Sequence, residues 1–158
     1  TEAAQTGEEY DTGVFTVTYP KNFMIMPQTD MWGEKDEDGN YPVDPKSLGI
    51  IKDGKDEWDA FSKNTVYIYY HDEGLTDSDV EWGIAWYDET EEFDYSLAGK
   101  ECSAYHCKND EYEYDIVFYP ISDSEYFQIN LNTNTDEDNP SSVTDSDFQG
   151  ILESITVD

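Results

Sequence analysis

Basic side chains are scarce in this sequence, which has 8 lysines, no arginine and 38 acidic residues, for a formal net charge of −30. Nucleic-acid binding needs clustered Lys and Arg to neutralise phosphates, so we exclude it. The same charge repels an anionic membrane surface, so we expect no membrane contact by the folded domain. No stretch approaches the roughly 20 apolar residues that a membrane-spanning helix needs.

Cysteine and histidine are also rare, with two of each. An exported protein normally joins such a pair as a disulfide, here Cys102 to Cys107. Five residues of regular strand would instead separate the two Cα atoms by about 16 Å, on opposite faces, whereas a bridge needs roughly 4.4 to 6.8 Å. A bridge across a turn and two free thiols therefore both stay open. A zinc site that adds His106 lacks a fourth ligand.

Motifs for catalysis are missing as well. The sequence has no Gly-x-Ser-x-Gly elbow and no glycine-rich phosphate loop. His71 ends a predicted strand among acidic residues, and His106 stands beside Cys107 without a partnered nucleophile in the sequence. We expect no enzyme and no catalytic residue. A hydrolase that uses two carboxylates stays open as an alternative, because 38 acids must form such pairs by chance.

Aromatic residues are abundant, at 15% of the chain, which is far above the content of disordered proteins. A length of 158 residues fits one domain, which we place at residues 10–158. The polar segment 1–9 is typical of a flexible tether. Its start at Thr1 rather than Met favours an exported, extracellular protein, membrane-tethered through a removed or lipidated N-terminus. A shortened cytosolic protein is the alternative.

Apolar residues alternate with polar ones in several segments, and this period of two predicts strands. The clearest is 13–20, where Phe15, Val17 and Tyr19 share one face. Further predicted strands cover 64–71, 100–108, 111–121 and 125–133. Short polar links join the last three, so we expect them to form an antiparallel meander.

Two helices are predicted. Phe148, Ile151, Leu152 and Ile155 follow the i, i+3, i+4, i+7 rule, with a short strand expected at 154–157. The second helix is predicted at 79–91, where Ser78 and Glu81 have capping-box spacing and Trp82 and Trp86 would pack on the sheet. Residues in this second segment also alternate at period two, so a strand stays open there.

The segment 27–63 shows no sustained period and is rich in Gly, Pro and charge, which predicts a long acidic insertion. Within it, Trp32 and Trp58 could stack on a ligand such as a sugar ring, or pack in the core. Its acidic turn resembles an EF-hand loop, although position 12 is Pro45. A weak Ca²⁺ site is therefore a candidate, and a solvated acidic turn explains the same residues. The proposed oxygen ligands are Glu34, Asp36, Asp38, Asn40 and Asp44.

Three motifs resemble the PsbP-like domains, and in particular their bacterial lipoprotein branch. They are the Phe-x-Val-x-Tyr-Pro strand at 15–20, the Leu-Ala-Gly-Lys segment at 97–100 and the Phe-x-x-Ile-Leu-x-Ser-Ile segment at 148–155. The resemblance spans roughly residues 10 to 158. It implies an α+β fold with an antiparallel sheet flanked by helices, an α/β/α sandwich, and mostly non-enzymatic binding or assembly roles.

Together these observations predict a non-enzymatic extracellular binding or assembly domain of an exported bacterial lipoprotein. We expect a monomer whose partner is a protein or glycan at the cell surface, with no cofactor apart from the candidate Ca²⁺. The alternatives are the carboxylate hydrolase and a calcium-stabilised structural domain.

Overall fold

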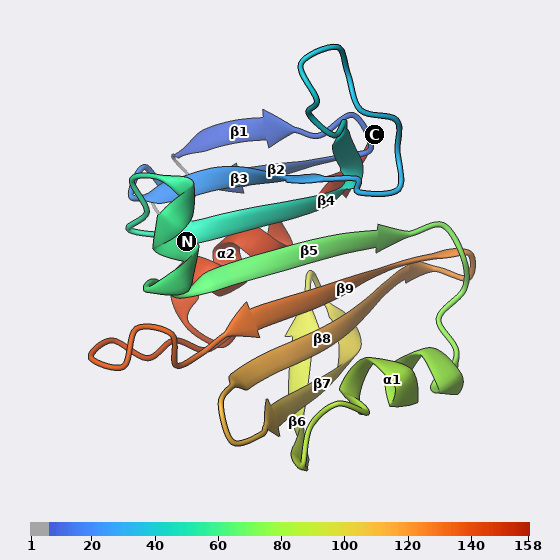
Figure 1. The fold of residues 1–158 in the computed structure, drawn as a ribbon. Coiled ribbons are helices and arrows are strands. Elements are labelled where there is room, and N and C mark those ends of the chain that lie inside the picture. The colour runs from blue at the N-terminus through green and yellow to red at the C-terminus, as the bar shows by residue number, and fades with distance from the viewer. Residues whose placement is uncertain (1–6) are drawn as a thin grey trace.

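The computed structural model describes residues 7–158, and its architecture is two antiparallel sheets with two short α-helices (Figure 1). The larger sheet has the order β3-β4-β5-β9-β8-β7-β6. Its strands are β3 (Phe23–Thr29), β4 (Val43–Lys52), β5 (Thr65–His71), β6 (Glu89–Leu97), β7 (Lys100–Lys108), β8 (Glu113–Ser122) and β9 (Glu125–Asn132). The smaller sheet, in the order β1-β2-β10, contains β1 (Glu8–Asp11), β2 (Phe15–Tyr19) and β10 (Thr156–Val157). The helices are α1 (Asp77–Ile84), α2 (Ser146–Glu153) and the 3-10 helix η2 (Glu57–Phe61).

The predicted α/β/α sandwich is wrong, because the fold is mostly β and resembles a β-sandwich. Each α-helix has only eight residues, which is about 12 Å of helix, too little to cover a seven-stranded sheet. The smaller sheet and α2 together cover one face of the larger sheet, which we call the inner face. The opposite, outer face carries α1 at one end.

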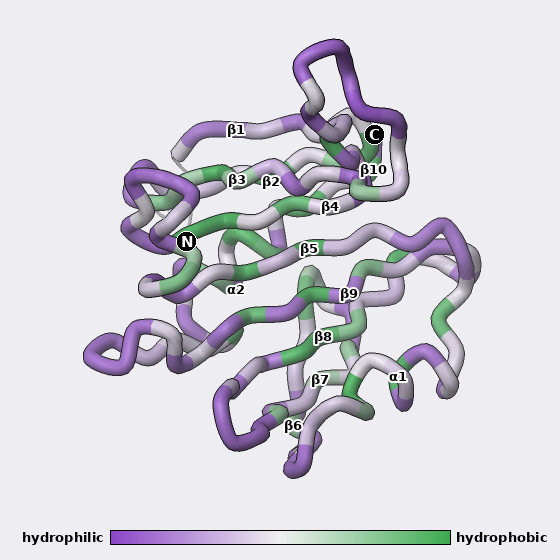
Figure 2. Tube along the Cα trace, in the orientation of Figure 1, coloured by the Kyte–Doolittle hydropathy of each residue, from purple (hydrophilic) through white to green (hydrophobic). Residues whose placement is uncertain are grey.

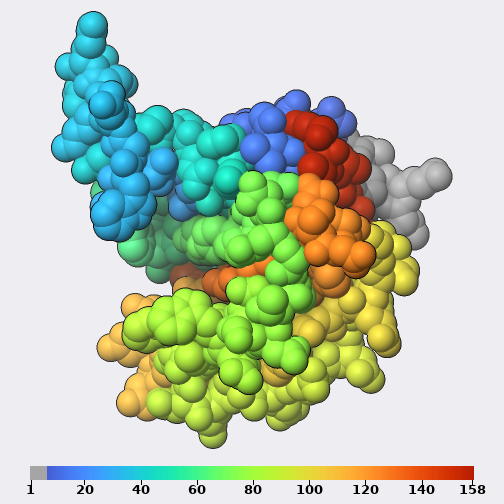
Figure 3. All heavy atoms as spheres, turned by 90° about the vertical axis from the view of Figure 1, so that its right-hand side faces the viewer, coloured from blue at the N-terminus to red at the C-terminus, as the bar shows by residue number. Residues whose placement is uncertain are grey.

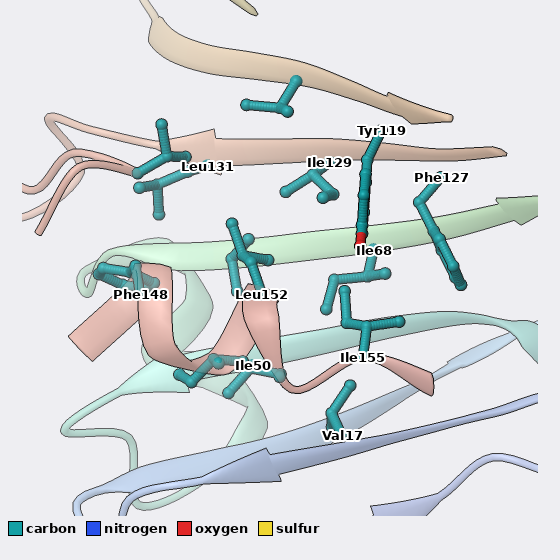
Figure 4. Close-up of a cluster of buried hydrophobic side chains, with 14 of the residues drawn as sticks. Val17, Ile50, Ile68, Tyr119, Phe127, Ile129, Leu131, Phe148, Leu152 and Ile155 are labelled. Carbon is teal, nitrogen blue, oxygen red and sulfur yellow. The ribbon is translucent and has the colours of Figure 1, made fainter. Parts of the chain in front are cut away.

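The core lies between the inner face, β2 and α2. Phe15 and Val17 of β2 are fully buried, as their alternation predicts. Phe148 and Leu152 of α2 lie in the same buried cluster as Ile129 and Leu131 of β9 (Figure 4). The predicted C-terminal helix and the strand after it are therefore confirmed. The meander of β7, β8 and β9 is also confirmed by the sheet order.

The segment expected to be an insertion differs from that prediction. Residues 43–52 form β4, which lies between β3 and β5 in the larger sheet. Residues 30–42 form a hydrophilic excursion between β3 and β4 (Figure 2), and residues 53–63, which include η2, connect β4 to β5. Of the expected tether, residues 1–6 lie outside the described part of the chain, and Glu8 and Glu9 belong to β1.

The helix predicted at 79–91 is displaced and shorter. Thr76 is the N-cap of α1, and it forms a capping box with Asp79 in place of the predicted Ser78 and Glu81. The helix ends at Ile84, and the residues from Glu89 onward belong to β6. Within residues 7–158, no helix is long and apolar enough to cross a membrane.

Candidate binding site

α1 covers one end of the outer face. Val80 and Ile84 of α1 lie over the buried Ile116 and Phe118 of β8. Tyr67 and Tyr69 of β5 and Gln128 and Asn130 of β9 are outward side chains that remain partly exposed beyond the helix. Seen from the side, this part of the surface is recessed between the projecting 30–42 excursion and the segment that contains α1 (Figure 3).

Tyrosines and amides fill the recessed part of the outer face. Strand alternation turns Val66 and Ile68 of β5 inward, and therefore turns Tyr67 and Tyr69 outward. Their rings are stacked, with centroids 6.5 Å apart and an interplanar angle of 14°. Since burial raises the pKa of Tyr69 to about 12, its phenol stays neutral at physiological pH. Neutral phenols can both donate and accept hydrogen bonds.

A hollow of about 750 Å³ opens at the end of this face near η2, and we call it the aromatic groove. Five aromatic side chains line it, namely Trp58, Phe61, Tyr67, Tyr112 and Tyr114. Polar side chains and three glutamates complete the lining, namely Asn132, Asn134, Thr135, Glu57, Glu111 and Glu137. The groove thus combines flat apolar surfaces with hydrogen-bonding groups, and it contains no basic residue in its lining.

The helix η2 presents the most exposed aromatic pair of the groove. The carboxylate of Asp56 accepts a hydrogen bond from the backbone N–H of Trp58 at 3.0 Å, which fixes the first turn. Trp58 and Phe61 stack with centroids 6.1 Å apart, and 69% and 79% of their surfaces are exposed. These two large apolar rings are exposed to solvent on a short capped helix and do not pack in the hydrophobic core. They are therefore candidates for ligand contact.

One hydroxyl in the groove lacks a partner. Thr135 Oγ1 is buried, and no hydrogen bond satisfies it among the residues that the structure describes. An unsatisfied buried hydroxyl costs free energy, about 1–3 kcal/mol.

A second hollow of about 610 Å³ lies further along the same face, and we call it the His71 hollow. Tyr69, Gln128 and Asn130 form its floor, and His71 lies at its rim, stacked on Tyr126 with centroids 4.6 Å apart. Acidic residues outnumber the single lysine in its lining, as they do elsewhere on the chain.

Of the two tryptophans predicted to contact a ligand, the structure places only Trp58 in a hollow. Trp32 is 98% exposed on the 30–42 excursion and is not part of either lining. Core packing, the alternative for both, is wrong. The predicted packing of Trp82 and Trp86 on the sheet is wrong too, because Trp82 of α1 and Trp86, just after the helix, are both more than 70% exposed.

The candidate calcium ligands do not converge. The carboxylate of Asp36 accepts hydrogen bonds from the backbone N–H groups of Asp38 and Asn40, each at 2.9 Å, as in a solvated turn. Asp44 accepts from Lys46 N in the same way. Within residues 7–158, no group of three or more His, Cys, Asp or Glu side chains is placed to hold a metal ion. Calcium binding stays a prediction.

The two cysteines are free thiols in the structure. Both lie on β7, which runs regularly from 100 to 108, so Cys102 faces the main core and Cys107 faces the cluster under α1. This is the arrangement in which strand geometry prevents a bridge. Burial raises the pKa of the Cys102 thiol to about 11 and that of the Cys107 thiol to about 12.

His106 belongs to a cluster of His, Asp and Ser side chains. These are the residue types of a catalytic triad, but their hydrogen bonds connect them in a different order. Its Nδ1 bonds the buried carboxylate of Asp115, whose other oxygen accepts from Ser142 Oγ at 3.0 Å and from Val143 N at 3.1 Å. A catalytic triad places the imidazole between the hydroxyl and the carboxylate, so that it can take the proton. Here the carboxylate is central, and the cluster ties β7 and β8 to the segment before α2.

Comparisons with known proteins are sparse. No family model matches the chain, and no curated protein sequence matches it. Among solved structures, a crystal structure from Bacteroides thetaiotaomicron VPI-5482 at 1.50 Å resolution is similar, with a TM-score of 0.52 and 9% identity. The similarity covers 96% of this chain and 48% of that chain, so this chain spans about half its length. At this identity the likeness concerns the fold alone. Kinship with PsbP-like domains therefore stays a prediction.

Proposed function

We propose that the chain is a non-enzymatic binding domain whose aromatic groove binds a glycan without acidic groups. The observation that carries the proposal is the exposed stack of Trp58 and Phe61 beside the amides of Asn132 and Asn134. A sugar ring has an apolar face that stacks on aromatic rings and a rim of hydroxyl groups that bond amides and phenols.

The charge of the groove narrows the class of ligand. Three glutamates and no basic side chain line the groove, and the net charge of the chain is −30. An acidic glycan would meet like charge at close range, which opposes binding. A neutral glycan meets no such repulsion.

A protein partner was the other expectation for this surface. Protein interfaces bury roughly 800 Å² on each partner around aromatic anchors, and they are commonly flat. A hollow of about 750 Å³ has the size of a small-ligand site, which favours the glycan.

The proposal is tested with the whole chain against soluble neutral polysaccharides, namely hydroxyethyl cellulose, amylopectin and arabinoxylan, with polygalacturonate as the acidic comparison. Titration calorimetry should detect binding to at least one neutral polymer and none to polygalacturonate. Trp58→Ala should weaken that binding by about tenfold or more, because it removes the exposed stacking surface. Trp32→Ala is the matched control, since it removes an exposed tryptophan outside the groove.

Binding that is equally strong in the Trp58→Ala and wild-type chains, or no binding to any neutral polymer, would contradict the proposal. The same incubations distinguish the hydrolase alternative. Release of reducing ends over hours would show hydrolysis, whereas we expect the polymers to remain intact. The extracellular, lipoprotein setting stays a prediction.

A further inference from the structure

The aromatic groove and the His71 hollow share one pair of strands. On β5, Tyr67 lines the groove and Tyr69, the next outward residue, lines the His71 hollow. On β9, Asn132 lines the groove, whereas Asn130 lines the His71 hollow. The boundary between the hollows therefore falls between consecutive outward side chains on both strands.

The register of these strands joins the two hollows. Tyr67 of the groove pairs directly with Asn130 of the His71 hollow, and Tyr69 pairs with Gln128. Directly opposed residues in an antiparallel pair have Cβ atoms about 5 Å apart. The two hollows share no lining residue, and the stacked rings of Tyr67 and Tyr69 lie at the boundary between them. The hollows are thus neighbours on one face, and we call the pair of them the trough. From Tyr67 to His71 the strand β5 spans about 13 Å.

Polar groups recur along the trough. Gln128 Nε2 donates to Asn130 Oδ1 at 3.2 Å, which orients both amides and leaves further amide groups free. Asn132 follows two residues later beside the hydroxyl of Tyr114, at 3.5 Å. Stacked phenols and amides thus repeat at two-residue intervals, and such a row is complementary to a ligand that repeats along its own length.

We infer that the trough binds a linear neutral glycan lengthwise, with successive sugar units in the aromatic groove and in the His71 hollow, and not a single terminal sugar. This inference rests on the proposed function, because it assigns the ligand class to the same surface. Trp58 then contacts one end of the bound chain, and Tyr69 and Asn130 contact units further along.

The test uses the cello-, malto- and xylo-oligosaccharide series, from disaccharide to hexasaccharide, with the whole chain. In the series that binds, affinity should rise by about tenfold or more between disaccharide and hexasaccharide, which corresponds to about 1.4 kcal/mol. Asn130→Ala and Tyr69→Ala should lower hexasaccharide affinity by about tenfold and leave disaccharide affinity unchanged. Trp58→Ala should weaken binding at every length.

The outcomes separate the two proposals. If affinity stops rising at the disaccharide, or if Asn130→Ala binds the hexasaccharide as the wild type does, the lengthwise inference is overturned and the groove proposal stands. If no series binds, both are overturned. Asn130→Ala keeps the test decisive should Tyr69→Ala fold poorly, because Asn130 is a half-buried amide of the outer face. Trp32→Ala is again the control.

Discussion

Asp115 is the residue on which three segments depend. Its buried carboxylate bonds His106 of β7 and two groups of the segment before α2, Ser142 Oγ and Val143 N. A buried carboxylate requires such partners, since an unpaired one would be strongly disfavoured by desolvation. Each partner in turn loses its acceptor when the carboxylate is removed.

Asp115→Ala should therefore lower the free energy of unfolding by about 3 kcal/mol, since it leaves the buried Val143 N–H and its neighbours without an acceptor. Urea denaturation measures this loss. Asp110→Ala is the control, because it removes the same charge from an exposed turn and should change stability by less than about 0.5 kcal/mol. Equal effects of both substitutions would mean that the carboxylate cluster contributes nothing beyond its charge.

The thiols make a second prediction at this scale. In the folded chain burial holds the pKa of Cys102 near 11 and that of Cys107 near 12, above the ordinary 9.0. Between about pH 9 and 12 the folded state thus holds protons that the unfolded state has released. Stability from this source is fully present below pH 9 and is lost as pH rises toward 12.

At pH 8 the native Cys102 and Cys107 thiols should react with DTNB about 100-fold and about 1,000-fold more slowly, respectively, than those of the guanidinium-unfolded chain, because a pKa raised from 9.0 to about 11 or to about 12 lowers the thiolate fraction by these factors. Two thiols should be counted after unfolding. A count of zero under non-reducing conditions would show that Cys102 and Cys107 are bridged, against the regular course of β7.

Among the elements, α1 begins with a capping box that lies two residues before the position predicted from the sequence. Ser78 and Glu81 have capping-box spacing, but Thr76 and Asp79 make the box, with Asp79 N donating to Thr76 Oγ1 at 3.2 Å and Thr76 N donating to Asp79 Oδ2 at 2.9 Å. The sequence offers both pairs. Packing of Leu75, Val80 and Ile84 on the sheet selects between them.

Thr76→Ala should consequently destabilise the protein by about 1 kcal/mol, the usual loss for a removed N-cap, while Ser78→Ala should have little effect. Thermal unfolding and amide exchange in α1 measure both variants. A larger loss from Ser78→Ala would support the cap at the position first predicted.

The strands show what alternation can and cannot predict. In β2, polar and apolar residues alternate because one face is buried and the other is partly exposed, so the sequence identifies it. In β4, Leu48, Ile50 and Ile51 are all buried, because the turn at Gly54 covers Ile51 on the outer face. Because both faces of β4 are buried here, apolar and polar residues do not alternate along it, and the sequence alone predicted an insertion in place of a strand.

The candidate site was only partly predictable for the same reason. Trp58 is conspicuous as an aromatic residue among polar ones. Tyr67 and Tyr114 read as ordinary strand residues, since a sequence does not specify which face of a strand another element will cover. Their role depends on the sheet order, which sets β9 between β5 and β8, and on the partial exposure of the outward side chains there.

For the whole molecule, the dominant property is its charge. The net charge is −30 on 158 residues, and the negative side chains repel one another more strongly in the compact folded state than in the expanded unfolded chain. Of the five ion pairs found within residues 7–158, only that of Lys52 and Asp147, at 3.0 Å, has both side chains less than a third exposed. Attraction between opposite charges therefore offsets little of this repulsion.

Screening should for this reason stabilise the fold. Raising NaCl from 50 to 500 mM shortens the Debye length to about 4 Å, and we expect the melting temperature to rise by roughly 5 °C. KCl should act equally, because the effect is one of ionic strength. A melting temperature that falls or stays constant would mean that self-repulsion does not limit stability.

Millimolar CaCl₂ and MgCl₂, at ionic strength matched with NaCl, test the calcium-stabilised alternative in the same experiment. Equal shifts for the two cations are expected from general screening, since the acidic side chains are dispersed, whereas a steep rise with Ca²⁺ alone would reveal a specific site that binds the folded state.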